Sequence, residues 1–316
     1  MTSARPDPGL PFVSADRLNE LISPDRARDL LRNVLSSGFD VAGDPPRLSV
    51  DAGAGHLLIM PSDLDRWVGV KIASVAPGNP ALGLERIQAV YLVMDGATLT
   101  PSLLIDGTAL TALRTPAMTA VAADALADPE SSRLLVYGTG PQARAHVRAI
   151  AAVRELTSVR LIGRNRDRLL DAVAAISATG IDAQPGSTED ITEADMIVCA
   201  TSAEVPLFDG RLVRDGAFVA AIGSHEPDRR ELDGTLLERS LVVVEDVATA
   251  LVSSGDVVLA RSEGNLRSDD LVSITDVARG RTKRDPDRPN VFKGAGMSWQ
   301  DLAVAAEVAN IELGEP

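Results

Sequence analysis

The chain changes its rhythm of hydrophobic and polar positions at Arg133. Before that point, short runs that alternate apolar and polar residues predict strands at 47–50, 56–60, 67–74, 87–94 and 100–105. Two amphipathic helices precede these strands. Ser14 caps the first, and Ser23-Pro24-Asp25 begins the second, which ends at Gly38. With a further helix over 111–126, the pattern predicts an α+β unit built on a strand meander.

Beyond Arg133, runs of consecutive apolar residues alternate with helical patterns. Strands are expected at 134–137, 158–162, 181–184, 196–201, 217–223 and 241–245, with one helix ending at Val153 and another over 167–178. Such strands between helices indicate a parallel sheet buried on both faces. The polar segment 279–290 is expected to be a loop. Ser298 to Asp301 resembles a capping box that starts a final helix, whose return to the first unit would make the parallel sheet an insertion.

The turn after the first strand of this parallel region carries a recognisable motif. Residues 138–143 read Gly-Thr-Gly-Pro-Gln-Ala, a G-x-G-x-x-A pattern between a strand and a helix. Gly138 permits the tight turn, and Gly140 lets backbone N–H groups approach a pyrophosphate at the positive end of the helix. Ala143 is small enough for close helix–strand packing. The context favours dinucleotide binding over an ordinary tight turn.

The end of the second parallel strand bears on which dinucleotide is bound. An acidic residue there normally accepts the ribose 2′-hydroxyl of NAD. In this chain the strand is followed by Gly163, Arg164, Asn165 and Arg166, with no carboxylate at its tip. Cationic donors suit a 2′-phosphate, so we expect NADP(H) to be preferred, with NAD(H) possible. The alternative is that these arginines are solvated loop charges.

Composition restricts the classes of partner. Lys and Arg number 31 against 45 Asp and Glu, for a net charge of −14, which argues against nucleic acids and anionic membrane surfaces as partners. The single Cys199 lies in an apolar run and fits a reducing cytoplasm as a buried thiol. No apolar run is long enough to span a membrane, and Met1 to Phe12 lacks a signal-peptide core. We therefore expect a cytoplasmic protein.

Several polar residues stand where a binding site is expected. Lys71 interrupts an apolar strand, Arg114 lies at the edge of an apolar helix, and Arg47 begins a strand. Two arginines that converge on one pocket would hold a carboxylate in bidentate fashion, and a buried lysine suits proton transfer. His225 follows an apolar strand at the end where parallel sheets bind ligands. Surface charges and a loop histidine are the alternatives. No spacing of His, Cys and carboxylates predicts a metal site.

These segments together resemble the ornithine cyclodeaminase/mu-crystallin family. The matching pieces occur in the family's order and cover nearly the whole chain. They are 57–61, 70–71, 113–115, 138–143, 200–201, 222–224 with Pro227, 230–232, and 291–293 before Gly296.

The resemblance implies an architecture and a set of roles. It implies a homodimer in which a Rossmann-type doubly wound parallel sheet, residues 116–296, is inserted into a discontinuous α+β substrate-binding and dimerisation domain, residues 1–115 plus 297–316. Arg47, Met60, Lys71 and Arg114 are expected to bind substrate, with Lys71 and His225 as catalytic residues. Cofactor binding is expected from Arg114, Thr115, Gly138, Gly140, Pro141, Gln142, Ala143, Arg164, Asn165, Arg166, Thr201, Gly223 and Gly294.

Two differences between this chain and the deaminating members of the family bear on which of the family's activities to expect. Deaminating members carry a glutamate for the distal amine of ornithine where this chain has Leu58, and a catalytic aspartate where it has His225. Asp228 matches a different position, though a shifted loop could bring it in. A leucine cannot pair an ammonium, so these changes favour an NAD(P)H-dependent oxidoreductase acting on the C–N bond of a small α-amino or α-imino acid, such as a ketimine reductase, cyclic-imine reductase or alanine dehydrogenase.

Two other functions stay open at this point. One is ornithine or lysine cyclodeaminase, which releases ammonia and recycles its NAD internally. The other is a non-enzymatic NADPH-binding protein of the mu-crystallin type, for which Lys71 would be unnecessary.

Overall fold

The computed structural model describes residues 9–314, so most of the segment that lacks a signal-peptide core lies outside the described residues. The chain divides into two compact units. The first comprises the residues up to Leu30, Gly43–Arg114 and those from Met297 onward, and the second comprises Leu31–Ala42 and Thr115–Gly296. The chain therefore leaves the first unit and returns to it through its last helix. The short segment Leu31–Ala42 groups with the second unit, although the expected limits assign it to the first.

The first unit is built on a six-stranded sheet in the order β1-β6-β5-β4-β3-β2. Strands β2 to β6 form the predicted antiparallel meander, and the short β1, which the pattern did not predict, pairs in parallel with β6. Its elements are β1 (Phe12–Val13), α1 (Ala15–Leu21), the start of α2 (Pro24–Ser36), β2 (Leu48–Ala52), β3 (Gly55–Leu64), β4 (Trp67–Val75), β5 (Ile87–Asp95), β6 (Pro101–Asp106), the start of α3 (Gly107–Leu126) and α10 (Ser298–Leu313). Ser14 and Ser23 cap α1 and α2 as expected.

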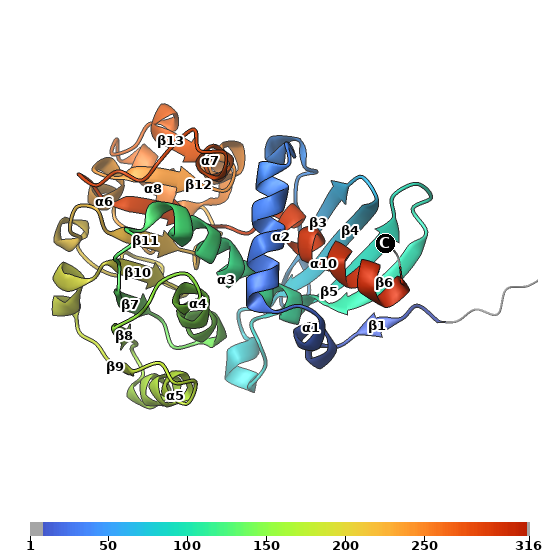
Figure 1. The fold of residues 1–316 in the computed structure, drawn as a ribbon, viewed down its shortest axis with the longest axis horizontal. Helices are drawn as coiled ribbons and strands as arrows, with labels where there is room; N and C mark the ends of the chain where they lie inside the picture. The colour runs from blue at the N-terminus through green and yellow to red at the C-terminus, as the bar shows by residue number, and fades with distance from the viewer. Residues whose placement is uncertain (1–8, 315–316) are drawn as a thin grey trace, which may run out of the picture. The chain divides into compact units, whose positions relative to one another are not determined.

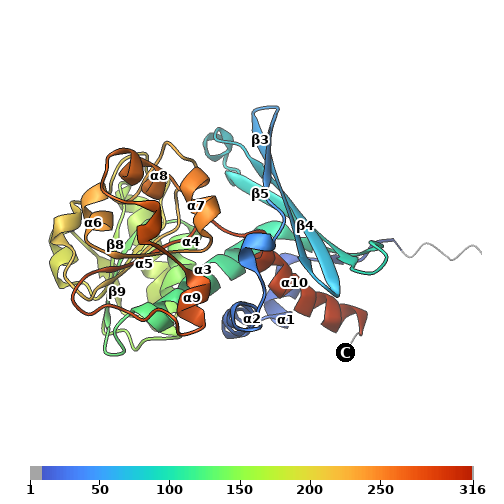
Figure 2. The ribbon, with the colours of Figure 1, turned by 90° about the horizontal axis from the view of Figure 1, so that it is seen from above.

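One face of this sheet is covered by helices and the other is open. Figure 2 shows α1 and α10 on the same side of β3, β4 and β5. Trp67 at the start of β4 donates its indole N–H to Asn310 Oδ1 of α10 at 2.8 Å, and Trp67 is buried. Lys71 and Tyr91 are direct cross-strand neighbours on the covered face. The covered face is therefore the place to look for buried functional side chains in this unit.

The second unit contains an eight-stranded parallel sheet in the order β13-β12-β14-β11-β10-β7-β8-β9 (Figure 1). The chain runs from β7 to β8 and β9 in one direction and continues with β10 and β11 on the other side of β7, the arrangement of a doubly wound fold. Its elements are the rest of α3, β7 (Arg133–Tyr137), α4 (Pro141–Ala151), β8 (Ser158–Ile162), α5 (Arg166–Ser177), β9 (Ala183–Pro185), β10 (Met196–Cys199), β11 (Phe218–Ala221), α6 (Gly234–Glu238), β12 (Leu241–Val244), α7 (Val247–Ser253), α8 (Gly255–Ser262), β13 (Leu271–Ser273), α9 (Ile274–Ala278) and β14 (Asn290–Lys293), with short 3₁₀ turns elsewhere.

Two strands of this sheet were not predicted from the pattern. β13 lies at one edge, and β14 lies between β11 and β12. β14 follows the charged loop directly and ends in a lysine, so its four residues do not stand out as an apolar run. β7, β10, β11 and β12 are apolar and buried, as predicted, and Cys199 is buried among them. The prediction is wrong for the sheet edge at β8 and β9, since β8 alternates buried and half-buried residues and only Ala183 of β9 is buried. Among the described residues, no helix is long and apolar enough to cross a membrane.

Candidate active site

The predicted dinucleotide loop lies at the carboxyl end of β7 and leads into α4. Gly138 has φ 128°, and a Cβ there would lie 2.5 Å from the carbonyl oxygen of Ala200 and 3.4 Å from the Cβ of Ala143. This position therefore requires glycine. A Cβ on Gly140 would meet nothing within 4 Å, so the protein itself gives no steric reason for a glycine there. Gly140 is the N-cap of α4 and has no side chain to cap the helix. The free N–H groups and the open space beside them fit a bound pyrophosphate.

The tip of β8 presents arginines, as the sequence predicts. Arg164 and Arg166 are exposed, and Asn165 caps α5 by accepting the backbone N–H of Arg168 at 2.9 Å. The amide oxygen of Asn165 is therefore engaged in the helix cap. Gly163 packs so closely on the loop that a Cβ would lie 2.4 Å from Thr139 Cγ2. The arginine-bearing tip of β8 therefore lies beside the loop at 138–143.

In the first unit, a buried ion cluster joins three elements. Lys71 Nζ on β4 lies 2.6 Å from Oδ2 of Asp301 on α10, and Arg114 Nε on α3 lies 3.1 Å from Oδ1 of the same carboxylate. Arg114 Nη1 also donates to Gln300 Oε1 at 2.8 Å. The side chains of Lys71, Arg114 and Asp301 are 3%, 5% and 0% exposed. Met60, also buried, is the cross-strand neighbour of Lys71.

The charges of this cluster do not cancel. Burial lowers the pKa of Lys71 to about 8; the Asp301 carboxylate opposes this shift, and Arg114 and Arg47 add to it. Arg47, which is partly buried, lies close enough to act on Lys71. Two buried cations, Lys71 and Arg114, thus share the single carboxylate of Asp301. A buried excess of positive charge is costly unless an anion joins it. The cluster is therefore suited to binding the carboxylate of a substrate.

The sequence pattern predicts only a helix-capping role for Asp301 and Gln300, whereas the structure makes both candidates for the functional site. The predicted capping box from Ser298 to Asp301 is wrong by one residue. Met297 is the N-cap of α10, and its N–H donates to Gln300 Oε1 at 3.4 Å. The Asp301 carboxylate is instead held by Lys71 and Arg114. The sequence does contain one indication that Asp301 is buried. This acidic residue directly precedes the apolar stretch 302–305, a part of the helix that must be buried.

The remaining predicted residues lie in loops at the carboxyl ends of the parallel strands. Thr201 follows β10, Gly223 and His225 follow β11, and Gly294 follows β14. His225 is partly buried, whereas Asp228 is exposed. The parallel strands put these loops at the same edge of the sheet as the loop at 138–143. The structure therefore brings the predicted cofactor-binding residues of the second unit to one edge, where doubly wound sheets bind ligands.

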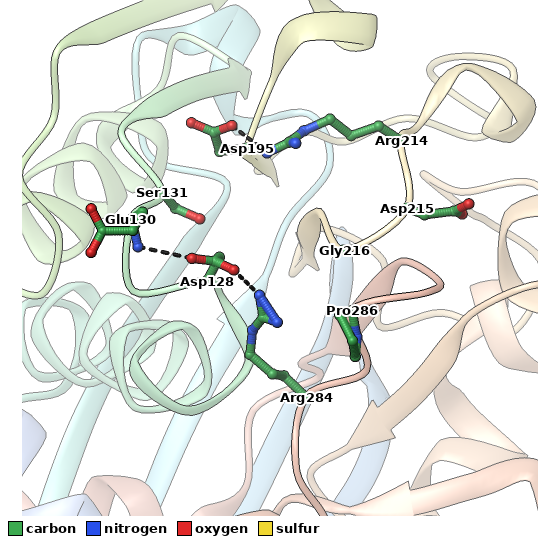
Figure 3. Close-up of a pocket in the computed structure, with 9 residues that line it drawn as sticks. All are labelled: Asp128, Glu130, Ser131, Asp195, Arg214, Asp215, Gly216, Arg284 and Pro286. Atoms are coloured by element: carbon green, nitrogen blue, oxygen red, sulfur yellow. Dashed lines mark hydrogen bonds and ion pairs between the residues drawn. The ribbon is translucent and has the colours of Figure 1, made fainter.

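A cavity of about 380 Å³ lies elsewhere in the second unit (Figure 3). Its lining includes residues that precede β7, β10 and β11, which places it at the amino ends of the strands. Both of its arginines are paired: Arg214 with Asp195, and Arg284 with Asp128. This cavity therefore offers no unpaired cation to an anionic ligand. Within the described residues, no group of three or more His, Cys, Asp or Glu side chains is arranged to hold a metal ion.

Comparisons with known proteins agree with this geometry. The sequence model of the ornithine cyclodeaminase/mu-crystallin family matches residues 21–313. A Δ1-pyrroline-2-carboxylate reductase of Colwellia psychrerythraea is 28% identical over 311 residues, covering 94% of this chain and 98% of that protein. The solved structure of the Thermococcus litoralis Δ1-pyrroline-2-carboxylate reductase with NADH and L-proline superposes with a TM-score of 0.90 at 26% identity, covering 96% and 98% of the two chains. The structure of an archaeal alanine dehydrogenase dimer with bound NAD also superposes with a TM-score of 0.90, at 27% identity and with 97% of each chain covered.

Proposed function

We propose that the substrate of this chain is a small cyclic imino acid. The chain belongs to the ornithine cyclodeaminase/mu-crystallin family and is an NAD(P)H-dependent oxidoreductase that acts on the C–N bond of an α-amino or α-imino acid. The observation that carries the proposal is the buried excess of positive charge around Asp301. It fits the carboxylate of an α-imino acid. The reductases named among the relatives act on substrates of this kind, pyrroline-2-carboxylate among them.

Different residues of this chain have different proposed roles in the reduction. Arg47 and Arg114 hold the substrate carboxylate, and Met60 contributes an apolar wall. Lys71, protonated at neutral pH because its pKa is about 8, donates a hydrogen bond to the reacting C=N group and can deliver the proton that the nitrogen takes up. His225 is the second candidate acid or base. When bound, a reduced nicotinamide would supply the hydride for the α-carbon, so that one hydride and one proton would convert imine to amine.

The binding of the cofactor is assigned to the second unit. The free N–H groups at the start of α4 and the open space at Gly140 suit the pyrophosphate. Thr115, Pro141, Gln142, Ala143, Thr201, Gly223 and Gly294 complete the predicted set. The exposed Arg164 and Arg166 at the tip of β8, where no acidic side chain stands, support a preference for NADP(H). Relatives solved with NADH or NAD support NAD(H) as the other possible cofactor.

The substrate is expected to be small and uncharged beyond its carboxylate. Leu58 is two residues before Met60 on β3 and is the cross-strand neighbour of the buried Ala73, so it lies on the same face of the sheet as Lys71. An apolar side chain there gives no partner to a distal ammonium. A five- or six-membered cyclic imino acid, or an N-alkyl imine of pyruvate, meets this requirement, whereas ornithine does not.

The open face of the six-stranded sheet supports a homodimer. Four apolar residues form a ladder across it, since Leu48 pairs with Ile59, Ile59 with Ile72, and Ile72 with Val90. Three of them are exposed: Leu48 by 55%, Ile72 by 42% and Val90 by 36%. A continuous apolar face of this kind is typical of an interaction surface. A second copy of the chain is the proposed occupant, supported by the dimer of the alanine dehydrogenase that this chain resembles.

The test of the proposed function follows the absorbance of the reduced nicotinamide. Purified protein is mixed with NADPH or NADH and with pyrroline-2-carboxylate, pyruvate plus methylamine, or pyruvate plus ammonia, while ammonia release from L-ornithine is measured in parallel. We expect net consumption of reduced cofactor with the cyclic imine. Ammonia release from ornithine without net cofactor change would instead establish a cyclodeaminase.

A further inference from the structure

A buried carboxylate connects two loops at the edge of the parallel sheet where the cofactor is expected to bind. Glu231 is 0% exposed. Its Oε1 accepts the backbone N–H and the hydroxyl of Thr201 at 2.8 and 2.7 Å, and its Oε2 accepts the N–H of Gly223 at 2.7 Å. Thr201 lies two residues beyond the end of β10, and Gly223 lies two residues beyond the end of β11. One side chain therefore fixes equivalent points of two neighbouring strands.

The two loops pack closely around this carboxylate. A Cβ on Gly223 would lie 1.9 Å from the carbonyl oxygen of Thr201 and 2.7 Å from Glu231 Oε1. The two loops thus touch where Glu231 joins them. A carboxylate is well suited to this task because it only accepts hydrogen bonds, and all three donors point at it.

A second layer holds Glu231 itself. Asp256, at the start of α8, accepts the backbone N–H groups of Glu231 and Leu232 at 2.7 and 2.8 Å. Its other oxygen lies 3.1 Å from Nζ of Lys293, the last residue of β14, and both side chains are fully buried. Lys293 Nζ also donates to the carbonyl oxygen of Ala221 at 3.3 Å. The network therefore links the carboxyl ends of β10, β11 and β14.

We propose that Glu231 is a positioning residue that shapes the nicotinamide half of the cofactor site by fixing the loops at Thr201 and Gly223. The inference rests on the proposed function. The loop at 138–143 and the arginine tip lie at β7 and β8, and these take the pyrophosphate and the adenosine half. The other end of the dinucleotide then extends over β10 and β11, where Glu231 acts. Glu231 itself need not touch the cofactor.

The test separates the two halves of the cofactor. Dissociation constants are measured by calorimetry for NADPH and for 2′-phospho-ADP-ribose, which lacks the nicotinamide; NADH and ADP-ribose serve if the wild type prefers them. In Glu231→Gln, one acceptor oxygen becomes a donor that opposes a backbone N–H. We expect the dinucleotide to bind about tenfold more weakly, the effect of losing one charge-assisted hydrogen bond, while the fragment binds as in the wild type.

Two further variants make the test specific. Glu231→Asp keeps the charge but is too short to reach both loops, so it should show the same selective loss, and it carries the test if Glu231→Gln does not fold. Asp195→Asn is the matched control. Asp195 is a buried carboxylate that accepts the backbone N–H groups of Ser132 and Arg133, both at 2.9 Å, at the opposite end of the same sheet. It should lower the melting temperature without changing the ratio of the two dissociation constants.

The outcomes distinguish this inference from the proposed function. Equal weakening of both ligands, unchanged binding in the Glu231 variants, or the same selective loss in Asp195→Asn would overturn the positioning role while leaving the cofactor assignment intact. A wild-type protein that binds neither NADPH nor NADH would overturn both.

Discussion

Asp301 on α10 neutralises Lys71 on β4 across 230 residues of sequence, with 2.6 Å between Oδ2 and Nζ. The same carboxylate binds Arg114. Because burial lowers the pKa of Lys71 and Asp301 opposes this shift, the carboxylate keeps the lysine protonated near neutral pH. The ion pair thus connects the position of the last helix to the protonation state of the candidate catalytic group.

Replacing Asp301 with asparagine should shift the pH dependence of imine reduction. A step that needs protonated Lys71 is lost as the pH rises through the pKa of Lys71, about 8 in the wild type. Without the carboxylate this pKa falls, so the loss should begin at lower pH and kcat/KM at pH 8 should drop by about tenfold or more. Glu307→Gln, which removes a partly exposed carboxylate of the same helix, is the control. An unshifted profile in Asp301→Asn would exclude this role.

Lys71→Met should abolish turnover and leave NADPH binding intact. Methionine is close to lysine in size and fills the same buried space without a proton to donate. Turnover is followed by cofactor absorbance, and NADPH binding by calorimetry. If the variant loses NADPH binding as well, Lys71 supports the structure rather than the chemistry.

Arg164→Ala tests the preference for the 2′-phosphate. Removing one guanidinium that binds a phosphate should weaken NADPH by about tenfold and leave NADH unchanged. Arg168, exposed on α5 beyond the tip of β8, provides the control in Arg168→Ala. Equal affinities for NADH and NADPH in the wild type would contradict the predicted preference at the outset.

Ile72→Glu should convert the proposed dimer into a monomer. Ile72 lies in the middle of the apolar ladder on the open face, and burying an unpaired carboxylate there costs several kcal/mol. Sedimentation velocity measures the mass. Leu170→Glu changes a similarly exposed leucine, 45% exposed on α5, and should leave the oligomeric state unchanged. A dimer that survives Ile72→Glu must use another surface.

His146 should make the protein sensitive to mild acid. It is fully buried, and its Nδ1 and Nε2 lie 2.8 Å from the Gln142 carbonyl and 3.0 Å from the Thr119 hydroxyl. Burial lowers its pKa from 6.5 to about 4, so the unfolded chain takes up the proton first. Its contribution to stability is complete above pH 6.5 and is lost progressively as the pH falls toward 4.

The size of this effect is measurable by urea unfolding at pH 7.5 and pH 5. The free energy of unfolding of the wild type should fall by about 2 kcal/mol more than that of His146→Gln, which has no group titrating in this range. Parallel losses in the two proteins would mean that other groups account for the acid sensitivity.

Local patterns predicted the elements well where they contain their own signal. The capped helices α1 and α2, the meander, the motif at 138–143 and the doubly wound fold all follow from periodicity and turn chemistry. The sequence pattern does not predict β14, because its place between β11 and β12 is set by pairing with strands that lie far away in the sequence.

In the candidate site, too, local patterns identify some residues and miss those whose contacts are made by distant parts of the chain. Lys71 and Arg114 stood out as charges in apolar segments, but nothing local to Asp301 indicates that it faces Lys71, because that contact depends on α10 covering the sheet. The proposed role of Glu231 likewise could not be predicted from the sequence. Its three donors come from two loops that only the parallel pairing of β10 and β11 brings together.

The split of the first unit between the two ends of its sequence also sets an order of events during synthesis. Residues 43–114 leave the ribosome long before Met297–Leu313, and until then Lys71 has no carboxylate to neutralise it on the face that α10 will cover. The second unit, whose sheet is synthesised in between, can complete that sheet once β14 has emerged. The nascent chain therefore completes its parallel sheet first, and the buried cluster of Lys71, Arg114 and Asp301 forms only after Asp301 has been added.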